Sequence, residues 1–172
     1  YTPFPVTVCG YLCPNVCMQH CTRAVEGLKP VDISVLGKAS LEARPPAPAP
    51  PTGRRVAIVG GGPAGLSIAW QLYLKGHQPV VYDRGEELGG KITSSIPSLR
   101  IPDEIVRREI DRVKGLIPEV RLKAEMTREA FTKLRDEFDY VVIATGAQKP
   151  RMLPIPGIER ALPALDFLRA AK

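Results

Sequence analysis

The sequence predicts an α/β fold in which a parallel sheet follows a small, mainly α-helical, cysteine-rich segment. The sheet is predicted by an apolar, β-branched run at residues 56–59, which enters a glycine-rich turn at 60–65 and continues into a helical pattern. A second apolar run follows that helix, and strands that alternate with helices are typical of parallel sheets. The cysteine-rich segment is predicted by four cysteines that all lie within residues 9–21.

Three glycines of the turn, Gly60, Gly62 and Gly65, have the spacing of a dinucleotide-binding strand–turn–helix unit. The first permits the tight turn, the second lets a pyrophosphate approach the backbone, and the third lets the helix pack closely on the sheet. Proline suits the first turn of the helix, whose N–H groups and positive dipole end attract phosphates. The expected phosphate-binding residues of this Rossmann-like unit are Gly60, Gly61, Gly62, Pro63, Ala64 and Gly65.

An acidic residue follows the second strand of this unit. Apolar residues recur at helical spacing over 66–73, Gly76 is placed to end that helix, and the strand at 79–82 ends in Asp83. A carboxylate about 20 residues after the glycine turn hydrogen-bonds a ribose hydroxyl. The charge of Asp83 disfavours the 2′-phosphate of NADP, although Arg84 offsets part of this repulsion. FAD or NAD therefore fits this position better than NADP does.

A second helix and a short strand are predicted further along the chain. Apolar residues recur at helical spacing over 105–117, where Asp103 is a good N-cap and Pro118 ends the helix. A brief strand follows at 120–122, and Thr127 is placed to cap the next helix.

The last predicted strand and a pair of glycines mark further places where a ligand can approach the backbone. The run at 140–144 has the composition of a strand buried on both faces of a parallel sheet. It leads to Gly146, in the place where open α/β sheets bind ligands. The paired glycines Gly89 and Gly90 leave room for a second backbone approach to a cofactor phosphate or ribityl chain.

The four cysteines Cys9, Cys13, Cys17 and Cys21 lie in one short run, and the rest of the chain has none. Two disulfides require an oxidising compartment, which nothing in the sequence indicates. Zinc sites usually combine two close pairs of ligands separated by a longer loop. Thiolates from a compact loop with a Cys-Pro step, here Cys13-Pro14, are typical of iron–sulfur clusters. The spacing therefore favours a cluster and leaves a zinc site and free or disulfide thiols as alternatives.

A proline-rich stretch marks the boundary between two expected domains. Residues 45–51 form a stiff, polyproline-type spacer that cannot be helix or central strand. We therefore expect a cysteine-rich segment at 1–44, a tethering linker at 45–53 and an incomplete sheet domain at 54–172.

Composition excludes several classes of function. The net charge of +6 is modest and basic residues are interleaved with acidic ones, so we expect no nucleic-acid partner. Glycines and a proline interrupt the most apolar window, 56–74, so no membrane span is expected. No signal-peptide pattern is visible, and we expect a cytoplasmic protein. The sequence has no evident acid–base or nucleophile constellation, so we predict no catalytic side chain.

Several motifs occur together in one order along the chain. They are the cysteine run with Pro14, the glycine turn, Gly89-Gly90, Ile96-Pro97, Arg100-Ile101-Pro102, Ala144-Thr145-Gly146-Ala147 and Ile155-Pro156-Gly157. Together they resemble the N-terminal part of the glutamate synthase small (β) subunit family of FAD and iron–sulfur oxidoreductases, which is also similar to the front half of dihydropyrimidine dehydrogenase. The resemblance covers nearly the whole chain.

This resemblance implies cofactors, a route for electrons and a partner. It implies that FAD is held by the glycine turn and that the four cysteines ligate [4Fe–4S] clusters. NAD(P)H, bound by a domain expected downstream of Gly157, would reduce FAD by hydride transfer, and single electrons would pass through the clusters to a larger catalytic or electron-accepting subunit. The alternative is a zinc-stapled nucleotide-binding module with an assembly or regulatory role. The expected cofactor-binding residues outside the glycine turn are therefore Asp83, Arg84, Gly90, Lys91, Arg100, Met126 and Gly146. Arg84 is included because it follows Asp83 in the sequence.

Two residues depart from the family pattern. Asp83 stands where the family usually has glutamate, which gives it a shorter reach to the ribose. Lys91 stands where an apolar residue is common. We expect its ammonium group to lie in solvent, because long lysine stems extend toward water; the alternative is a cation that raises the reduction potential of the flavin.

Overall fold

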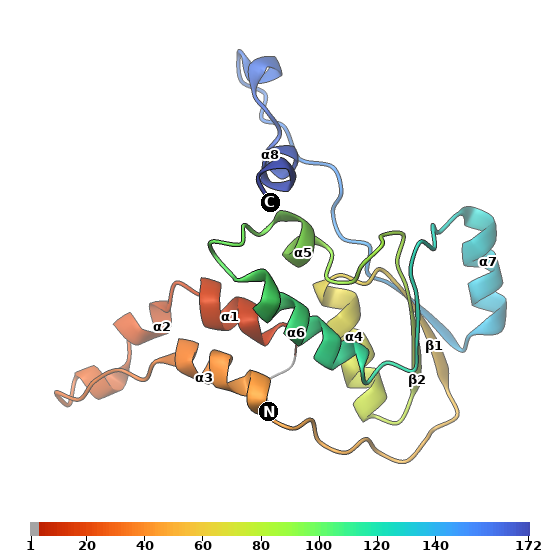
Figure 1. The fold of residues 1–172 in the computed structure, drawn as a ribbon, viewed down its shortest axis with the longest axis horizontal. Coiled ribbons are helices and arrows are strands. Elements are labelled where there is room, and N and C mark those ends of the chain that lie inside the picture. Colours follow the sequence, from red (N-terminus) through yellow and green to blue (C-terminus); the bar gives the residue numbers. More distant parts are fainter. Residues whose placement is uncertain (1–3) are drawn as a thin grey trace.

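A computed structural model describes residues 4–172, in which short helices over the N-terminal segment precede a region of mixed strands and helices that begins at residue 55 (Figure 1). Residues 1–3 of the segment expected at 1–44 lie outside the described residues. Among the helices of residues 4–172, none is long and apolar enough to cross a membrane. The elements are α1 (Val6–Leu12), α2 (Val16–Gln19), η1 (Thr22–Ala24), α3 (Ile33–Ala39), η2 (Ser40–Glu42), β1 (Arg55–Val59), α4 (Pro63–Leu74), β2 (Gln78–Tyr82), α5 (Lys91–Ser95), α6 (Asp103–Lys114), β3 (Glu119–Arg121), α7 (Arg128–Glu137), β4 (Tyr140–Ile143), η3 (Ile158–Arg160) and α8 (Ala164–Ala171).

The strands form one parallel sheet in the order β3-β2-β1-β4. In its register, Val56 of β1 lies opposite Pro79 of β2 on one side and Tyr140 of β4 on the other. The chain runs from β1 outward to β2 and β3 and then returns to the far side of β1. The strand order therefore reverses at β1, and ligands of open α/β sheets bind at the carboxyl ends of strands at such a reversal. The predicted α/β fold with a parallel sheet is confirmed.

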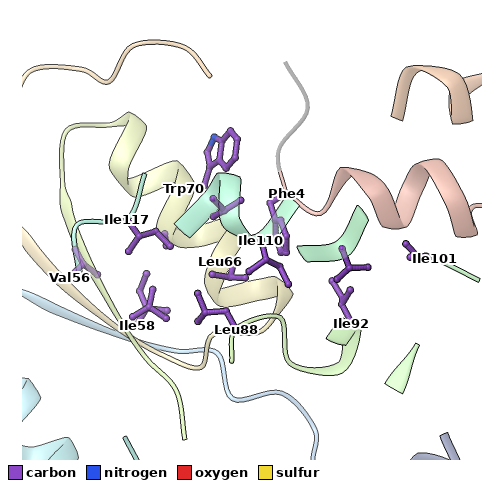
Figure 2. Close-up of a cluster of buried hydrophobic side chains, with 14 residues drawn as sticks. Phe4, Val56, Ile58, Leu66, Trp70, Leu88, Ile92, Ile101, Ile110 and Ile117 are labelled. Atoms are coloured by element: carbon purple, nitrogen blue, oxygen red, sulfur yellow. The ribbon is translucent and has the colours of Figure 1, made fainter. Parts of the chain in front are cut away.

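The main core lies on the face of the sheet where α4 and α6 pack (Figure 2). Val56 and Ile58 of β1, Leu66 and Trp70 of α4, and Ile110 of α6 are all buried there. The alternate residues of β1 and β2 face a smaller core that includes residues of α7. Helices therefore pack on both faces, which is the usual environment of a parallel sheet.

Two predicted helix ends are confirmed. Helix α4 begins at Pro63, and Gly76 adopts a positive φ of 79° just beyond the C-cap of the helix. Only glycine adopts that conformation at little cost. At the start of α7, the Oγ1 of Thr127 accepts a hydrogen bond from the amide of Ala130 at 3.2 Å.

Both ends expected for the helix at 105–117 are wrong. Helix α6 begins at Asp103 itself, so Pro102 occupies the cap position, and the Asp103 carboxylate binds Ser98 and Lys172 instead, both within 2.8 Å. The helix ends at Lys114, about one turn before Pro118. Glycine follows at the C-cap position, and glycine loses the most backbone entropy in a helix, which favours the earlier end.

The expected burial of the strand at 140–144 is also wrong. Strand β4 forms an edge of the sheet among the described residues, and Tyr140 and Ile143 are 62% and 67% exposed. Its apolar composition correctly predicted a parallel strand. Burial depends in addition on which elements cover the strand, and composition does not reveal that.

Residues of α6 hold the N-terminal segment against the sheet domain. Phe4 inserts into the main core, and the buried carboxylate of Glu109 accepts a hydrogen bond from the amide of Val6 at the start of α1. Arg108 forms an ion pair with Glu42 of η2 at 2.6 Å. The segment that carries the cysteines is therefore docked on the same helix that packs against the sheet (Figure 1).

The proline-rich linker contains neither helix nor strand, but it is bonded to the turn after α4. The amide of Ala49 donates to the Leu74 carbonyl at 2.9 Å, and the amide of Thr52 donates to the Gly76 carbonyl at 2.9 Å. The Thr52 hydroxyl also lies 2.7 Å from Nδ1 of His77. These bonds fix the path of the linker across the end of α4.

Asp139→Asn should weaken the sheet at neutral pH and make its stability less sensitive to acid. The Asp139 carboxylate accepts a hydrogen bond from the Arg55 amide at 2.8 Å and pairs with Arg54 at 2.6 Å, and both contacts hold the pKa of Asp139 below its ordinary value. A pKa lowered in the folded state adds stability above the unfolded pKa, about 3.9, and that stability is lost as the pH falls through the folded value.

Urea unfolding of the wild type and the variant over a range of pH tests this prediction. The difference in free energy of unfolding should be largest near neutral pH, should narrow below about pH 4, and should close once the pH is below the folded-state pKa of Asp139. Asp136→Asn on α7 removes the same charge from an exposed position, and as the matched control it should leave the free energy of unfolding at neutral pH close to that of the wild type. A wild-type to Asp139→Asn difference that is constant with pH would contradict the prediction.

Candidate functional site

Three loops meet at the carboxyl edge of the sheet, where the strand order reverses. They are residues 60–65 after β1, 83–91 after β2 and 144–148 after β4. The amide of Gly89 donates to the carbonyl of Gly61 at 2.8 Å, which joins the first two loops. A Cβ built on Gly60 would lie 2.4 Å from the carbonyl oxygen of Ala144, so the first and third loops are also in backbone contact. The structure thus brings together most of the residues predicted to bind a cofactor.

The glycine turn is packed too closely for side chains at two of its positions. A Cβ on Gly65 would lie only 1.8 Å from the carbonyl oxygen of Gly60. Gly60 also adopts a φ of 114°, which L side chains rarely accept. These contacts hold the start of α4 against the end of β1, as the spacing of the glycines predicts.

At Gly62, in contrast, the turn faces open space. A Cβ built there would meet only the Cα of Gly90, at 3.9 Å, among the described residues. The adjacent amides of Ala64 and Gly65 belong to the first turn of α4, where a helix offers no intrahelical acceptor. A bare backbone, free N–H groups and the positive end of a helix dipole make this notch suitable for a phosphate group.

The carboxylate of Asp83 holds the backbone of the notch in place. Its Oδ2 accepts a hydrogen bond from the amide of Gly61 at 2.6 Å, and its Oδ1 accepts one from the amide of Gly85 at 2.7 Å. A carboxylate has about four acceptor positions, so each oxygen retains one for a further donor such as a ribose hydroxyl. Sequence reasoning placed this residue at the site but missed its bond to the glycine turn.

Two cations reach from the loop after β2 to the loop after β4. The Nζ of Lys91 donates to the carbonyl oxygen of Ala147 at 2.5 Å, and Nη2 of Arg84 lies 3.4 Å from Oε1 of Gln148. The Lys91 ammonium, which was expected in solvent, thus has a protein acceptor, although this hydrogen bond lies at the exposed surface. Lys91 is the first residue of α5, and its side chain reaches the carbonyl group of Ala147. A charged donor such as this ammonium group forms a stronger hydrogen bond than a neutral donor does. No sequence signal identified Ala147 as the partner of Lys91 or Gln148 as the partner of Arg84.

Two predicted residues lie outside this group of contacts. Arg100 is exposed in the turn after α5, where its backbone amide donates to the Pro97 carbonyl at 2.8 Å. Met126 is half-buried and packs against the smaller core under α7. Gly146, with a φ of 67°, does lie in the loop after β4.

Cys9 lies in α1, Cys13 just after α1, Cys17 in α2, and Cys21 between α2 and η1. Cys9, Cys13 and Cys17 are exposed, Cys21 is half-buried, and all four are free thiols. Hydrogen bonds from the backbone amides of Val31 and Arg23 lower the pKa of Cys21. The donor atoms suit an iron–sulfur cluster, but within residues 4–172 no three Cys, His, Asp or Glu side chains converge on a point that could hold a metal. This arrangement does not fit a single cluster held by all four thiols.

Gly65→Ala should lower the free energy of unfolding by about 3 kcal/mol or more, because its methyl group would overlap the Gly60 carbonyl and push α4 from β1. The matched control is Gly115→Ala. Gly115 lies at the end of α6, has φ −62°, and its added Cβ would come no nearer than 3.4 Å to its neighbours, so the control should be neutral or slightly stabilising. Thermal unfolding of both variants measures the difference, and equal stability would contradict the close packing described here.

Comparisons with known proteins agree with this geometry. The profile of the pyridine nucleotide-disulphide oxidoreductase family matches residues 54–172. The glutamate synthase [NADPH] small chain of Mycobacterium tuberculosis is 34% identical over 171 residues, which cover 92% of this chain and 34% of that protein. The NADPH-Fe(3+) oxidoreductase subunit beta of Geobacter sulfurreducens is 33% identical over 187 residues, which cover 98% of this chain and 27% of that protein.

A solved structure of 2-naphthoyl-CoA reductase is also similar, with a TM-score of 0.55 and 26% identity over 81% of this chain and 21% of that chain. The present chain spans about a third or less of the length of each of these proteins. The family profile nevertheless covers well over half of the sequence and includes all three loops of the notch. The chain therefore belongs to the pyridine nucleotide-disulphide oxidoreductase family, among the oxidoreductases that resemble the glutamate synthase small chain.

Proposed function

We propose that this chain is the FAD-binding part of an NAD(P)H-dependent flavin and iron–sulfur oxidoreductase subunit. The observation that carries the proposal is the open notch beside Gly62, at the point where the strand order reverses. A dinucleotide presents two linked phosphates to such a notch, and amides of the first turn of α4 are available to bind them. Family membership supports the assignment to oxidoreductases.

The acid at the end of β2 disfavours NADP at this site, and FAD is preferred to NAD here from the resemblance to the glutamate synthase small chain family. NADP carries a 2′-phosphate that a carboxylate repels. Arg84 is the nearest candidate to offset this charge, but its guanidinium group is directed toward Gln148. FAD has free ribose hydroxyls, and the remaining acceptor positions on Asp83 suit them.

The residues of the notch would bind and orient the cofactor. FAD, when bound, supplies the chemistry: it accepts a hydride from NAD(P)H and releases electrons one at a time. Gly62 leaves space for the diphosphate, Asp83 would receive the ribose, and the first turn of α4 would face the negative charge. The backbone of Gly90 and Lys91, together with Gly146, would line the path beyond the diphosphate. Arg100 and Met126 are proposed as cofactor contacts from the family pattern alone.

The iron–sulfur part of the proposal rests on the spacing of the cysteines and on their state. All four thiols are free, and three are exposed. In this arrangement they do not surround one centre. We therefore assign them as ligands shared between centres, with further ligands supplied from elsewhere in a longer protein, and we derive no electron-transfer step through them.

The electron donor and the acceptor follow from the relatives by analogy. Two relatives have NADPH in their names. One is a glutamate synthase small chain, and the other is an NADPH-Fe(3+) oxidoreductase subunit. For this chain we propose NAD(P)H as donor, bound by a separate domain, and a larger electron-accepting subunit as partner. The acceptor is left open, because one fold serves several chemistries.

Purification of the full-length protein without oxygen tests the cofactors. We expect flavin absorption bands together with iron and acid-labile sulfide, and bleaching of the flavin bands when NADH or NADPH is added. Stoichiometric zinc in a preparation without flavin or sulfide would refute the proposal and would support the zinc-stapled module in its place.

Asp83→Ala should raise the dissociation constant of FAD by about tenfold or more, since hydrogen bonds to a charged group contribute about 1.5–3 kcal/mol. The variant loses the ribose acceptor and also both bonds to the backbone of the notch. Asp83→Glu, which restores the carboxylate with the longer stem, should recover most of the affinity. Titration of the apoprotein with FAD, followed by flavin fluorescence, measures both. Unchanged affinity in Asp83→Ala would remove this residue from the site.

A further inference from the structure

The loop after β4 is the least buried of the three loops at the notch. Thr145, Gly146 and Ala147 are all exposed, and the chain then leaves the sheet edge toward α8 (Figure 1). Within the loop, the amide nitrogen of the Gln148 side chain donates to the Thr145 carbonyl at 2.7 Å. At the start of the loop, the amide of Ala144 donates to the Val59 carbonyl of β1 at 2.8 Å. Beyond Ala144, the bonds to the rest of the site come from side chains of the loop after β2, and the shorter of them is the one from Lys91 to Ala147.

Lys91 itself stands on a rigid base. A Cβ on the preceding Gly90 would lie 3.0 Å from the Cα of Gly62, so the start of α5 is packed directly against the glycine turn. The amide of Gly89 is bonded to Gly61, and the first turn of α5 is closed by bonds from Thr93 and Ser94 to the Gly90 carbonyl. The stem of Lys91 therefore extends from a fixed point beside the notch to residues 145–148, the exposed part of the loop, which few other contacts hold.

We propose that Lys91 is a positioning residue that fastens the loop after β4 across the mouth of the notch and thereby slows the release of FAD. It acts through its hydrogen bond to the Ala147 carbonyl rather than through charge at a distance. An apolar side chain at this position could not bind that carbonyl. The inference rests on the proposed FAD site and adds the residue that closes it.

The first test is the backbone order parameter of residues 145–148, measured by ¹⁵N relaxation on the full-length protein without FAD. Lys91→Met keeps a long stem but removes the donor, and it should lower the order parameters of these residues toward the range of a flexible backbone, below about 0.6. Lys91→Arg keeps a charged donor and should restore the wild-type values. The matched control, Lys133→Met on α7, removes a lysine from an exposed position on another element and should change nothing in this segment.

The second test is the rate at which FAD leaves the holoprotein, followed by the rise in flavin fluorescence after dilution. We expect about tenfold faster release from Lys91→Met and near wild-type release from Lys91→Arg and Lys133→Met. Thermal unfolding of the apoproteins shows whether Lys91→Met remains folded. If it does not, Lys91→Gln, a neutral donor, takes its place and should give an intermediate rate.

Each outcome decides a separate point. Unchanged order parameters at 145–148 in Lys91→Met would overturn the fastening contact. Lower order parameters with unchanged FAD release would overturn its role in retention. Faster release with unchanged order parameters would mean that Lys91 acts by charge alone, which also contradicts the proposal. A wild-type protein that binds no FAD would instead refute the proposed function, and the relaxation measurement would still decide whether the contact to Ala147 exists.

Discussion

Backbone contact at the glycine turn is the constraint on which the site depends. The carbonyl oxygen of Gly60 lies where a Cβ of Gly65 would be, and Gly60 itself touches the carbonyl group of Ala144. These contacts bring the first turn of α4 to the end of β1 and bring β4 alongside it. The dipole end of α4 consequently faces the point where the strand order reverses. A methyl group at either glycine would separate these elements and close the notch to an anion.

Helix α6 connects this site to the segment that carries the thiols. One side of α6 packs into the main core under the sheet, and another holds the start of α1 through the buried carboxylate of Glu109. A buried carboxylate is costly unless hydrogen bonds satisfy it, so the amide of Val6 is held firmly. The position of the cysteine segment relative to the notch is thus set by one helix, although the proline-rich linker joins the two parts in the chain.

The sequence predicted those parts of the site that local rules determine. The strand, turn, helix and acid from Val56 to Asp83 follow from glycine chemistry and apolar periodicity, and the structure has them in place. Contacts between residues distant in sequence were not predictable in the same way. The hydrogen bond from Lys91 to Ala147 depends on where α5 lies relative to the loop after β4. The Asp103 carboxylate, which was expected to cap a helix, instead contacts Lys172, a residue far along the chain.

Exposure was the second property that local patterns failed to predict. The apolar run of β4 is typical of a buried strand, but among the described residues Tyr140 and Ile143 are exposed on an edge strand of the sheet. The spacing of the cysteines likewise indicates their donor chemistry without indicating whether the sulfur atoms converge. Both properties depend on neighbouring elements rather than on the segment itself.

The three loops differ in how they are held, and this difference suggests how a dinucleotide enters. The loops at 60–65 and 83–91 are joined by the backbone bond from Gly89 to Gly61 and by the close packing of Gly90 against Gly62. In the third loop, Ala144 is bonded to Val59 of β1 and packed against Gly60, whereas residues 145–148 are exposed and side-chain hydrogen bonds hold them. Opening two backbones packed in contact would cost far more than releasing one exposed side-chain bond, which is worth at most a few kcal/mol. We therefore infer that the notch opens on the β4 side, while the glycine turn and the acid stay fixed as the surface on which the cofactor docks.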